Sequence, residues 1–249
     1  MNEKVLLITG SGRGIGAATA LLAAKQGYAV CLNYVNDEKS ALRVRDEILA
    51  LEGKCIVIRA DAANEHQVLK MFDEIDNQLG NITHLVNNVG ILKQKMSLID
   101  MDGERFREVL LTNVMSQFYC SREAIKRMSL SRGGSGGSIV NVSSGASRSG
   151  SPFEYVDYAS SKGAVDTFTT GLAKEVAADG IRVNCVRPGG IYTDIHADGG
   201  EALRVDRIAQ NLPMKRGGKP EEVAYAILWL LSNEASYVTG SFTDLCGGL

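Results

Sequence analysis

The chain has 249 residues, of which 45% are hydrophobic and 22% are charged, and its formal net charge is −2. A chain of this length buries about three quarters of its surface without metal or disulfide staples, and its balanced charge argues against nucleic acid as a partner. No run approaches the roughly twenty apolar residues that a membrane span requires.

The N-terminal residues and the cysteines both favour a cytoplasmic location. Residues 1–4 lead directly into a strand-like run and show neither the apolar core nor the cleavage site of a secretory signal. The five cysteines include no Cys-x-x-Cys pair, and three of them lie in apolar runs. This pattern is typical of buried thiols in a reducing compartment.

Short apolar runs alternate with longer amphipathic segments along the whole chain. Each run is apolar at successive positions rather than at every second one, which is typical of parallel strands buried on both faces. We therefore expect strands at residues 5–8, 29–32, 55–58, 85–86, 139–142, 183–186 and 241–245.

Helices are indicated between these runs. Apolar side chains within residues 68–79 recur at spacings of three and four, so they share one helix face. We expect Asn64 to cap the N-terminus of this helix, Gln67 to complete a capping box and Gly80 to end the helix. Pro220 is expected in the first turn of a later helix.

The alternation predicts an α/β fold: a single-domain, Rossmann-like, doubly wound parallel sheet of about seven strands with helices on both faces. We expect one domain over residues 1–249, because the Gly/Ser-rich segment 129–137 runs directly into a strand and is therefore a loop. Ligands of such sheets bind beyond the C-terminal ends of the strands. The charged, glycine-rich segment at about 191–218 is therefore expected to form a substrate lid.

A glycine-rich turn joins the first strand to the first helix. Its sequence is Thr9-Gly10-Ser11-Gly12-Arg13-Gly14-Ile15-Gly16. Glycines let the backbone turn sharply and approach a pyrophosphate closely, and a helix N-terminus presents free N–H groups with a partial positive charge. The turn therefore predicts a dinucleotide site.

Further motifs follow in chain order, and together they resemble the short-chain dehydrogenase/reductase family. They are Gly10 with Gly14 and Gly16, Asn87-Asn88-Val89-Gly90, Asn113, Ser143-Ser144, Tyr158-Ala159-Ser160-Ser161-Lys162, Pro188-Gly189 and Thr193. The resemblance covers nearly the whole chain and is nearest to bacterial members related to 3-oxoacyl-[acyl-carrier-protein] reductases and glucose 1-dehydrogenases. It implies hydride transfer between a nicotinamide dinucleotide and a small-molecule carbonyl or secondary alcohol substrate. The last strand and the helix before it, with Trp229, resemble the contacts of the family's homotetramer.

Tyr158 and Lys162 are expected to form the chemical centre. Their spacing of four residues places them on one face of a helix. Reduction of a ketone needs a proton at oxygen, and a nearby ammonium lowers the pKa of a tyrosine from its usual value of about 10. We therefore expect Tyr158 to act as the acid/base and Lys162 to lower its pKa. The resemblance adds that Lys162 holds the nicotinamide ribose.

The remaining catalytic residues follow from the resemblance. A second donor should polarise the substrate oxygen, and we expect Ser144 in this role, while Ser143 could satisfy backbone groups at the strand end. Asn113 would help to hold a water molecule that leads to Lys162.

The cofactor is expected to be NADP(H), with NAD(H) as the alternative. No acidic residue ends the second strand, where an NAD-binding protein usually carries one, and Arg13 could face a 2′-phosphate. The resemblance implies that Asp61 meets the adenine, that Asn88 and Gly90 line the cofactor and that Thr193 meets the nicotinamide amide. With these, the expected cofactor-binding residues are Gly10, Ser11, Gly12, Arg13, Gly14, Ile15, Gly16, Asn33, Asp61, Asn88, Gly90, Tyr158, Lys162, Pro188, Gly189, Ile191 and Thr193.

The substrate stays open among a 3-oxoacyl thioester, a sugar and a small ketone. Phe153 and Tyr155 could form an apolar pocket wall, and Glu154 would favour hydroxyl-rich substrates. Alternatively, all three pack under the lid or against a neighbouring subunit. The acids and the histidine within residues 194–198 fit ordinary lid polarity better than a metal site, so no metal is expected. A non-catalytic dinucleotide sensor or scaffold is the alternative function. A hydrolase or transferase is disfavoured, because the chain lacks a Gly-x-Ser-x-Gly elbow and a phosphate-binding Gly-x-x-x-x-Gly-Lys-[Ser/Thr] loop.

Overall fold

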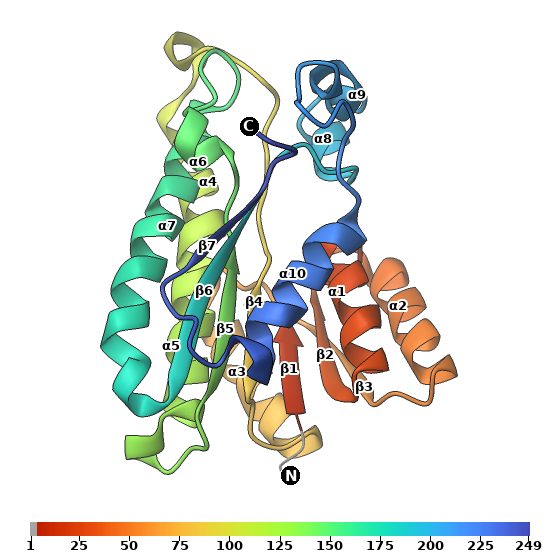
Figure 1. Cartoon of the computed structure of the whole chain (residues 1–249), viewed down its shortest axis with the longest axis vertical. Helices are drawn as coiled ribbons and strands as arrows, with labels where there is room; N and C mark the ends of the chain where they lie inside the picture. Colours follow the sequence, from red (N-terminus) through yellow and green to blue (C-terminus); the bar gives the residue numbers. More distant parts are fainter. Residues whose placement is uncertain (1–3) are drawn as a thin grey trace.

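Seven parallel strands form the centre of the computed structural model, which describes residues 4–249 (Figure 1). The expectation about the first three residues lies outside this range. The strand order is β3-β2-β1-β4-β5-β6-β7, so the chain reverses its direction of winding between β1 and β4. The strands are β1 (Lys4–Ile8), β2 (Tyr28–Tyr34), β3 (Cys55–Arg59), β4 (His84–Asn87), β5 (Gly137–Val142), β6 (Ile181–Pro188) and β7 (Phe242–Leu245).

Helices cover both faces of the sheet, as expected (Figure 1). One face carries α1 (Gly14–Lys25), α2 (Glu38–Ala50) and α10 (Pro220–Leu231), and the other carries α3 (Glu65–Gln78), α4 (Gly103–Leu110), α5 (Ser116–Met128) and α7 (Val156–Val176). A π-helical turn, η2 (Leu111–Met115), joins α4 to α5. The short helices α6 (Ala146–Ser149), α8 (Ile195–Asp198) and α9 (Arg204–Ala209) lie at the C-terminal end of the strands. The single-turn 3₁₀ segments are η1 (Leu98–Asp100), η3 (Leu130–Arg132), η4 (Ala177–Asp179) and η5 (Asn233–Ala235).

The strands are continuously apolar because each contributes to two hydrophobic clusters. In β1, Val5 and Leu7 pack into the cluster with α3, α5 and α7, while Leu6 and Ile8 pack into the cluster with α1, α2 and α10. Side chains alternate between the two faces of a strand, and each such side chain contributes about 1.5–3 kcal/mol when buried. The predicted strands are therefore confirmed, with most of them longer by one or two residues at an end.

The ends of α3 confirm most of the predicted capping. The Asn64 side chain accepts a hydrogen bond from the backbone N–H of Gln67 at 3.2 Å, and Gly80, with φ of +87°, follows the last turn. The predicted reciprocal hydrogen bond, from the backbone N–H of Asn64 to the Gln67 side chain, is wrong. The backbone N–H of Asn64 already donates to Asp61 O, so the Gln67 side chain accepts instead from the N–H of Asp61, at 2.9 Å. Pro220 begins α10, as predicted.

The segment expected to form the lid, residues 191–218 and here called the lid segment, is partly helical. Parallel bridging between Ile191 and Gly218 closes its base, and α8 and α9 form its upper part. The described residues contain no helix that is long and apolar enough to cross a membrane. All five cysteines are free thiols.

Candidate active site

The glycine-rich turn between β1 and α1 has the backbone geometry that a phosphate-binding loop needs. Gly10 and Gly14 have φ of +62° and +55°, and a Cβ at Gly16 would lie only 2.6 Å from Gly10 O. No side chain caps the N-terminus of α1, so its first-turn N–H groups are not occupied by a capping side chain. These features fit the pyrophosphate of a dinucleotide.

Two asparagines brace this loop from behind. The amide of Asn33 accepts from the N–H of Gly10 at 3.2 Å and donates to Ala60 O at 2.8 Å, and its side chain is fully buried. Asn88 donates to the carbonyls of Thr9 and Gly10 at 3.0 and 2.9 Å. The structure therefore gives Asn33 a bracing contact at the end of β2 rather than the open position that the cofactor prediction implied.

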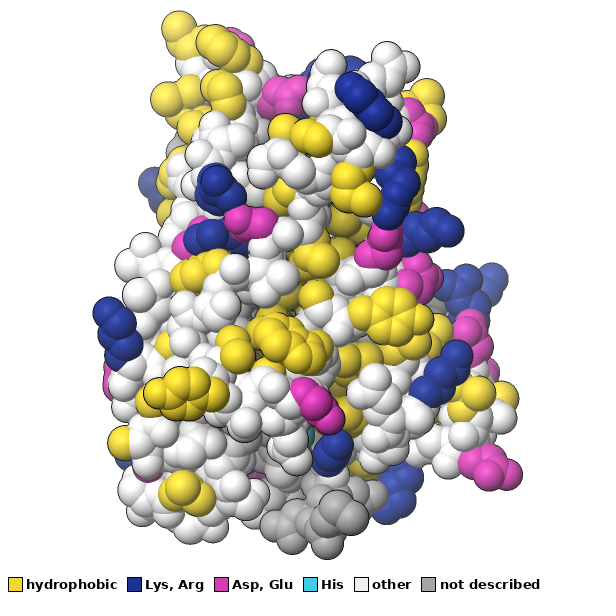
Figure 2. All heavy atoms as spheres, viewed as in Figure 1, with side chains coloured by type: hydrophobic (Ala, Val, Ile, Leu, Met, Phe, Trp, Pro, Cys, Tyr) yellow, Lys and Arg dark blue, Asp and Glu magenta, His cyan; other side chains and the backbone are white. Residues whose placement is uncertain are grey.

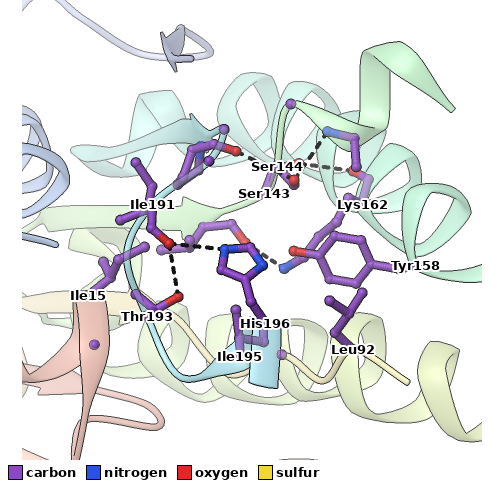
Figure 3. Close-up of a pocket in the computed structure, with 18 of the residues that line it drawn as sticks. Ile15, Leu92, Ser143, Ser144, Tyr158, Lys162, Ile191, Thr193, Ile195 and His196 are labelled. Carbon is purple, nitrogen blue, oxygen red and sulfur yellow. Dashed lines mark hydrogen bonds between the residues drawn. The ribbon is translucent and has the colours of Figure 1, made fainter. Parts of the chain in front are cut away.

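A cavity of about 670 Å³ opens at the C-terminal ends of the strands, between the glycine-rich turn, α7 and the lid segment (Figure 3). It brings together thirteen of the predicted site residues: Gly10, Arg13, Gly14, Ile15, Asn88, Gly90, Ser144, Tyr158, Lys162, Pro188, Gly189, Ile191 and Thr193. Six others lie outside its lining: Ser11, Gly12, Gly16, Asn33, Asp61 and Asn113. The lid segment meets the glycine-rich turn at its start, because a Cβ at Gly14 would lie 3.1 Å from Thr193 Cγ2.

Tyr158 and Ser144 both line the cavity wall. Burial raises the pKa of Tyr158, and the hydrogen bond from Ser144 and the charge of Arg204 only partly offset it. The expectation that Lys162 lowers this pKa is corrected. The helix does place Lys162 Nζ near the tyrosine, 5.6 Å from the ring centroid, but Nζ donates to Val142 O at 2.8 Å. Loss of hydration on burial therefore dominates at Tyr158.

Burial also shifts the pKa of Lys162. Its side chain is 2% exposed, and burial lowers the pKa to about 8, with Cys185 and Asp166 acting in the opposite direction. A Cβ at Gly90 would lie 3.4 Å from Nζ, so the lysine reaches the wall formed after β4.

The two serines after β5 have different surroundings. Ser143 is buried and its hydroxyl donates to Lys162 O at 3.1 Å, which satisfies a backbone carbonyl of α7. Ser144 is only partly buried, and its hydroxyl accepts from the N–H of Ala146 at 3.1 Å and donates to Pro188 O at 3.5 Å. Of the two serines, Ser144 is the one whose hydroxyl acts on the pKa of Tyr158.

Asn113 lies in η2 and connects the segment after β4 to α7. Its side chain accepts from the N–H of Ile91 at 2.7 Å and donates to Ile91 O and to Ser161 Oγ at 3.1 and 3.0 Å. Ser161 in turn donates to Tyr158 O. The π turn was not predicted, since a π turn arises from packing and carries no distinctive local pattern.

The charge of Glu154 is neutralised by the lid segment. Glu154 accepts from Arg204 at 2.5 Å and from Arg207 at 2.9 Å, and Glu201 pairs with the same two arginines. Burial alone raises the pKa of Glu154, but the two arginines outweigh it and leave the pKa below its usual value. Glu154 does not line the cavity, so the expectation that it selects hydroxyl-rich substrates is wrong.

The aromatic wall is made by one of the two predicted side chains. Tyr155 is 2% exposed, lines the cavity and donates to Gly199 O at 3.3 Å, with Arg204 packed 4.7 Å from its ring centroid. Phe153 is 84% exposed and does not line the cavity, so its predicted place in the wall is wrong.

A further ion pair joins the glycine-rich turn to the lid segment. Arg13 pairs with Asp198 of α8, and each side chain is about half exposed. This contact spans 185 positions of the chain, and nothing in the local sequence indicates it. The cation expected to face a 2′-phosphate therefore also touches the lid segment.

Comparison with known proteins gives matches over almost the whole chain. Residues 10–249 match a family model described as enoyl-(acyl carrier protein) reductase. The uncharacterized oxidoreductase YgfF of Escherichia coli is 59% identical over 244 residues, covering 98% of this chain and 99% of that protein.

More distant relatives carry names of two kinds. A glucose and ribitol dehydrogenase homolog of Oryza sativa is 35% identical over 260 residues, covering 100% of this chain and 86% of that protein. A 3-oxoacyl-[acyl-carrier-protein] reductase of Synechocystis is 36% identical over 250 residues, covering 100% of this chain and 98% of that protein. The chain therefore belongs to the short-chain dehydrogenase/reductase family, the NAD(P)-dependent oxidoreductases that act on carbonyl and CH–OH groups.

Proposed function

We propose that this enzyme transfers hydride between NADP(H) and a carbonyl or secondary alcohol substrate, with Tyr158 as the acid/base. The observation that carries the proposal is that one cavity is lined by Tyr158, Ser144 and the glycine-rich turn together. The bound dinucleotide supplies or accepts the hydride. The chain's own residues transfer the proton and form hydrogen bonds to the substrate oxygen.

Tyr158 donates the proton during reduction. Its raised pKa keeps the hydroxyl protonated at neutral pH, which suits a proton donor to a carbonyl oxygen that gains negative charge. Ser144 donates a second hydrogen bond to that oxygen and holds the substrate in line. In the direction of oxidation, Tyr158 first loses its proton and then accepts the one on the alcohol.

Lys162 and Asn113 support this proton transfer. Lys162 binds the ribose hydroxyls of the nicotinamide half, since its ammonium lies beside Gly90 at the cofactor side of the cavity. Asn113 positions the segment after β4 against α7 through Ile91 and Ser161, and it holds the water that leads to Lys162.

The preference for NADP(H) rests on Arg13. No carboxylate ends β2, and the half-exposed guanidinium of Arg13 lies beside Gly14. A guanidinium matches phosphate in charge and geometry. Residues 4–249 are proposed to act as one domain in the cytoplasm, with the lid segment folding over the substrate.

The test follows NADPH consumption by the purified protein with 2,3-butanedione. Replacement of Tyr158 by Phe removes the proton donor and keeps the ring, so turnover should fall by about 10²- to 10⁴-fold while NADPH binding is kept. Tyr155→Phe is the matched control, because Tyr155 lines the same cavity but its hydroxyl donates a hydrogen bond to Gly199 O. Equal turnover in wild type and Tyr158→Phe would refute the role of Tyr158. NADPH binding without turnover of any carbonyl would instead indicate a dinucleotide sensor.

A further inference from the structure

The lid segment carries a histidine whose ring has one satisfied and one unsatisfied nitrogen. His196 of α8 lines the cavity, and Figure 3 shows its ring turned towards Tyr158. Its Nε2 lies 3.0 Å from Ile191 O, while Nδ1 is buried without a hydrogen-bond partner among the described residues. The ring is thus held by a hydrogen bond at Nε2, while Nδ1 has no partner among the described residues.

The hydrogen bond determines which nitrogen carries the proton. A carbonyl oxygen can only accept, so Nε2 must be the protonated nitrogen. Burial lowers the pKa of His196. The hydrogen bond to Ile191 O opposes this effect, the charge of Arg204 adds to it and Glu201 opposes it, and the net lowering leaves the ring neutral at physiological pH. Nδ1 therefore presents a lone pair and acts only as an acceptor.

An unpaired buried acceptor is destabilising, which makes its location informative. Other unpaired buried side-chain atoms of the described residues belong to Tyr28, Asp76, Asn87, Arg105 and Gln117, and none of these residues lines the cavity. His196 alone among them stands at the cavity wall. Nδ1 is buried, so a substrate group contacts it only when the lid segment, which carries His196 on α8, moves as the substrate binds.

The surrounding groups define what that substrate group must be. Tyr158 and Ser144 donate to the reacting oxygen, so an acceptor beside them takes a different group of the substrate, one that donates. The nearby Arg204 is already paired with Glu154 and Glu201 and leaves no free charge for an anion. Leu92, Ile195 and Ile208 add apolar side chains to the same cavity wall.

We propose that His196 is a specificity-determining residue that accepts a hydrogen bond from a hydroxyl neighbouring the reacting carbon, so that the substrates are hydroxy ketones and the corresponding vicinal diols. This inference rests on the proposed function and specifies its substrate class. It distinguishes a polyol-type substrate from an acyl thioester, which offers no hydroxyl at that position.

The test compares two ketones that differ by one hydroxyl, 3-hydroxy-2-butanone and 2-butanone, with NADPH and with 2,3-butanedione as a reference substrate. The variants are His196→Phe, which keeps a ring and removes the acceptor, and His196→Asn, whose amide oxygen can occupy the place of Nδ1. Wild type should favour the hydroxy ketone in kcat/KM. His196→Phe should lose about 10- to 100-fold of that kcat/KM and change little with 2-butanone, and His196→Asn should recover part of the loss.

The possible outcomes separate the two proposals. An equal loss on both ketones in His196→Phe would show a structural role and overturn the inference. Reduction of 2,3-butanedione by wild type without any preference for the hydroxy ketone would also overturn it, while the proposed function would stand. No reduction of any of the three carbonyls by a protein that binds NADPH would remove the proposed function, and this inference with it.

Discussion

At the scale of single residues, the two ionisable groups in the centre of the site have pKa values displaced in opposite directions by the same cause. Burial raises the pKa of Tyr158 and lowers that of Lys162 to about 8. In both residues burial disfavours the charged form, tyrosinate in one and ammonium in the other. The proposed proton donor is thus held protonated, and the proposed ribose-binding cation is held close to the point where it loses its charge.

These displacements predict opposite pH profiles for the two reaction directions. Because the pKa of Lys162 is lowered, its ammonium is present below about pH 8 and is lost above it. Carbonyl reduction should therefore fall as pH rises through about 8, while Tyr158, whose pKa is raised, stays protonated over the measured range. Alcohol oxidation needs tyrosinate, so it should rise as the pH approaches the raised pKa of Tyr158. The measurement is kcat/KM in both directions between about pH 6 and 10. Lys162→Arg keeps its charge throughout, so it should lose this decline, and a flat reduction profile in wild type would contradict the assignment.

At the scale of elements, the parts predicted from sequence are those set by neighbours in the chain. Each apolar run is a strand, Asn64 and Gly80 bound α3, and the glycine-rich turn stands between β1 and α1. Tyr158 and Lys162 share a face of α7 because helical spacing is local. These features follow from residue period and backbone freedom alone.

Other features depend on residues that are far apart in sequence, and these were missed. Asn33 was expected to bind the cofactor, yet its side chain connects Gly10 to Ala60, the residue after β3. Glu154 was expected to carry its charge into the pocket, yet two arginines of α9 pair with it. Long-range pairing has no periodicity in the sequence, so only the folded arrangement reveals it.

The ion pair between the glycine-rich turn and α8 leads to a prediction about cofactor choice. If Arg13 binds a 2′-phosphate, Arg13→Ala should weaken NADPH binding by about 10- to 100-fold, the effect of a hydrogen bond to a charged group, and leave NADH nearly unchanged. Asp198 competes for the same guanidinium. Because an exposed ion pair is worth about 0–1 kcal/mol, Asp198→Asn should tighten NADPH binding by up to about fivefold.

Fluorescence titration of NADPH and NADH measures both effects. Arg43→Ala is the control, because Arg43 is an exposed arginine of α2 that pairs only weakly, with Glu47 at 4.0 Å. Equal losses for NADPH and NADH in Arg13→Ala would show that Arg13 contacts the pyrophosphate or the loop rather than a 2′-phosphate.

At the scale of the whole molecule, the face that carries α10 and β7 has an apolar surface. Figure 2 shows hydrophobic side chains gathered across the middle of this face, where α10 and β7 lie in Figure 1. Tyr225 and Trp229 of α10 are 60% and 47% exposed, and their spacing of four residues puts them on one side of the helix. β7 pairs with β6 on one side and ends the sheet on the other, which leaves an edge strand beside this surface.

We expect this face to be a contact between copies of the chain in a homotetramer. An aromatic side chain at an interface buries about 150–250 Å², and burying an unpaired carboxylate in its place is strongly unfavourable. Trp229→Glu should therefore convert the tetramer to smaller species in light scattering. Leu49→Glu is the matched control, because Leu49 lies on α2 and is 48% exposed, nearly the same as Trp229. The control should keep the mass of the wild type. A monomeric wild type, or a tetramer that survives Trp229→Glu, would show that the α10 face is not the contact, and the apolar surface would then need another partner.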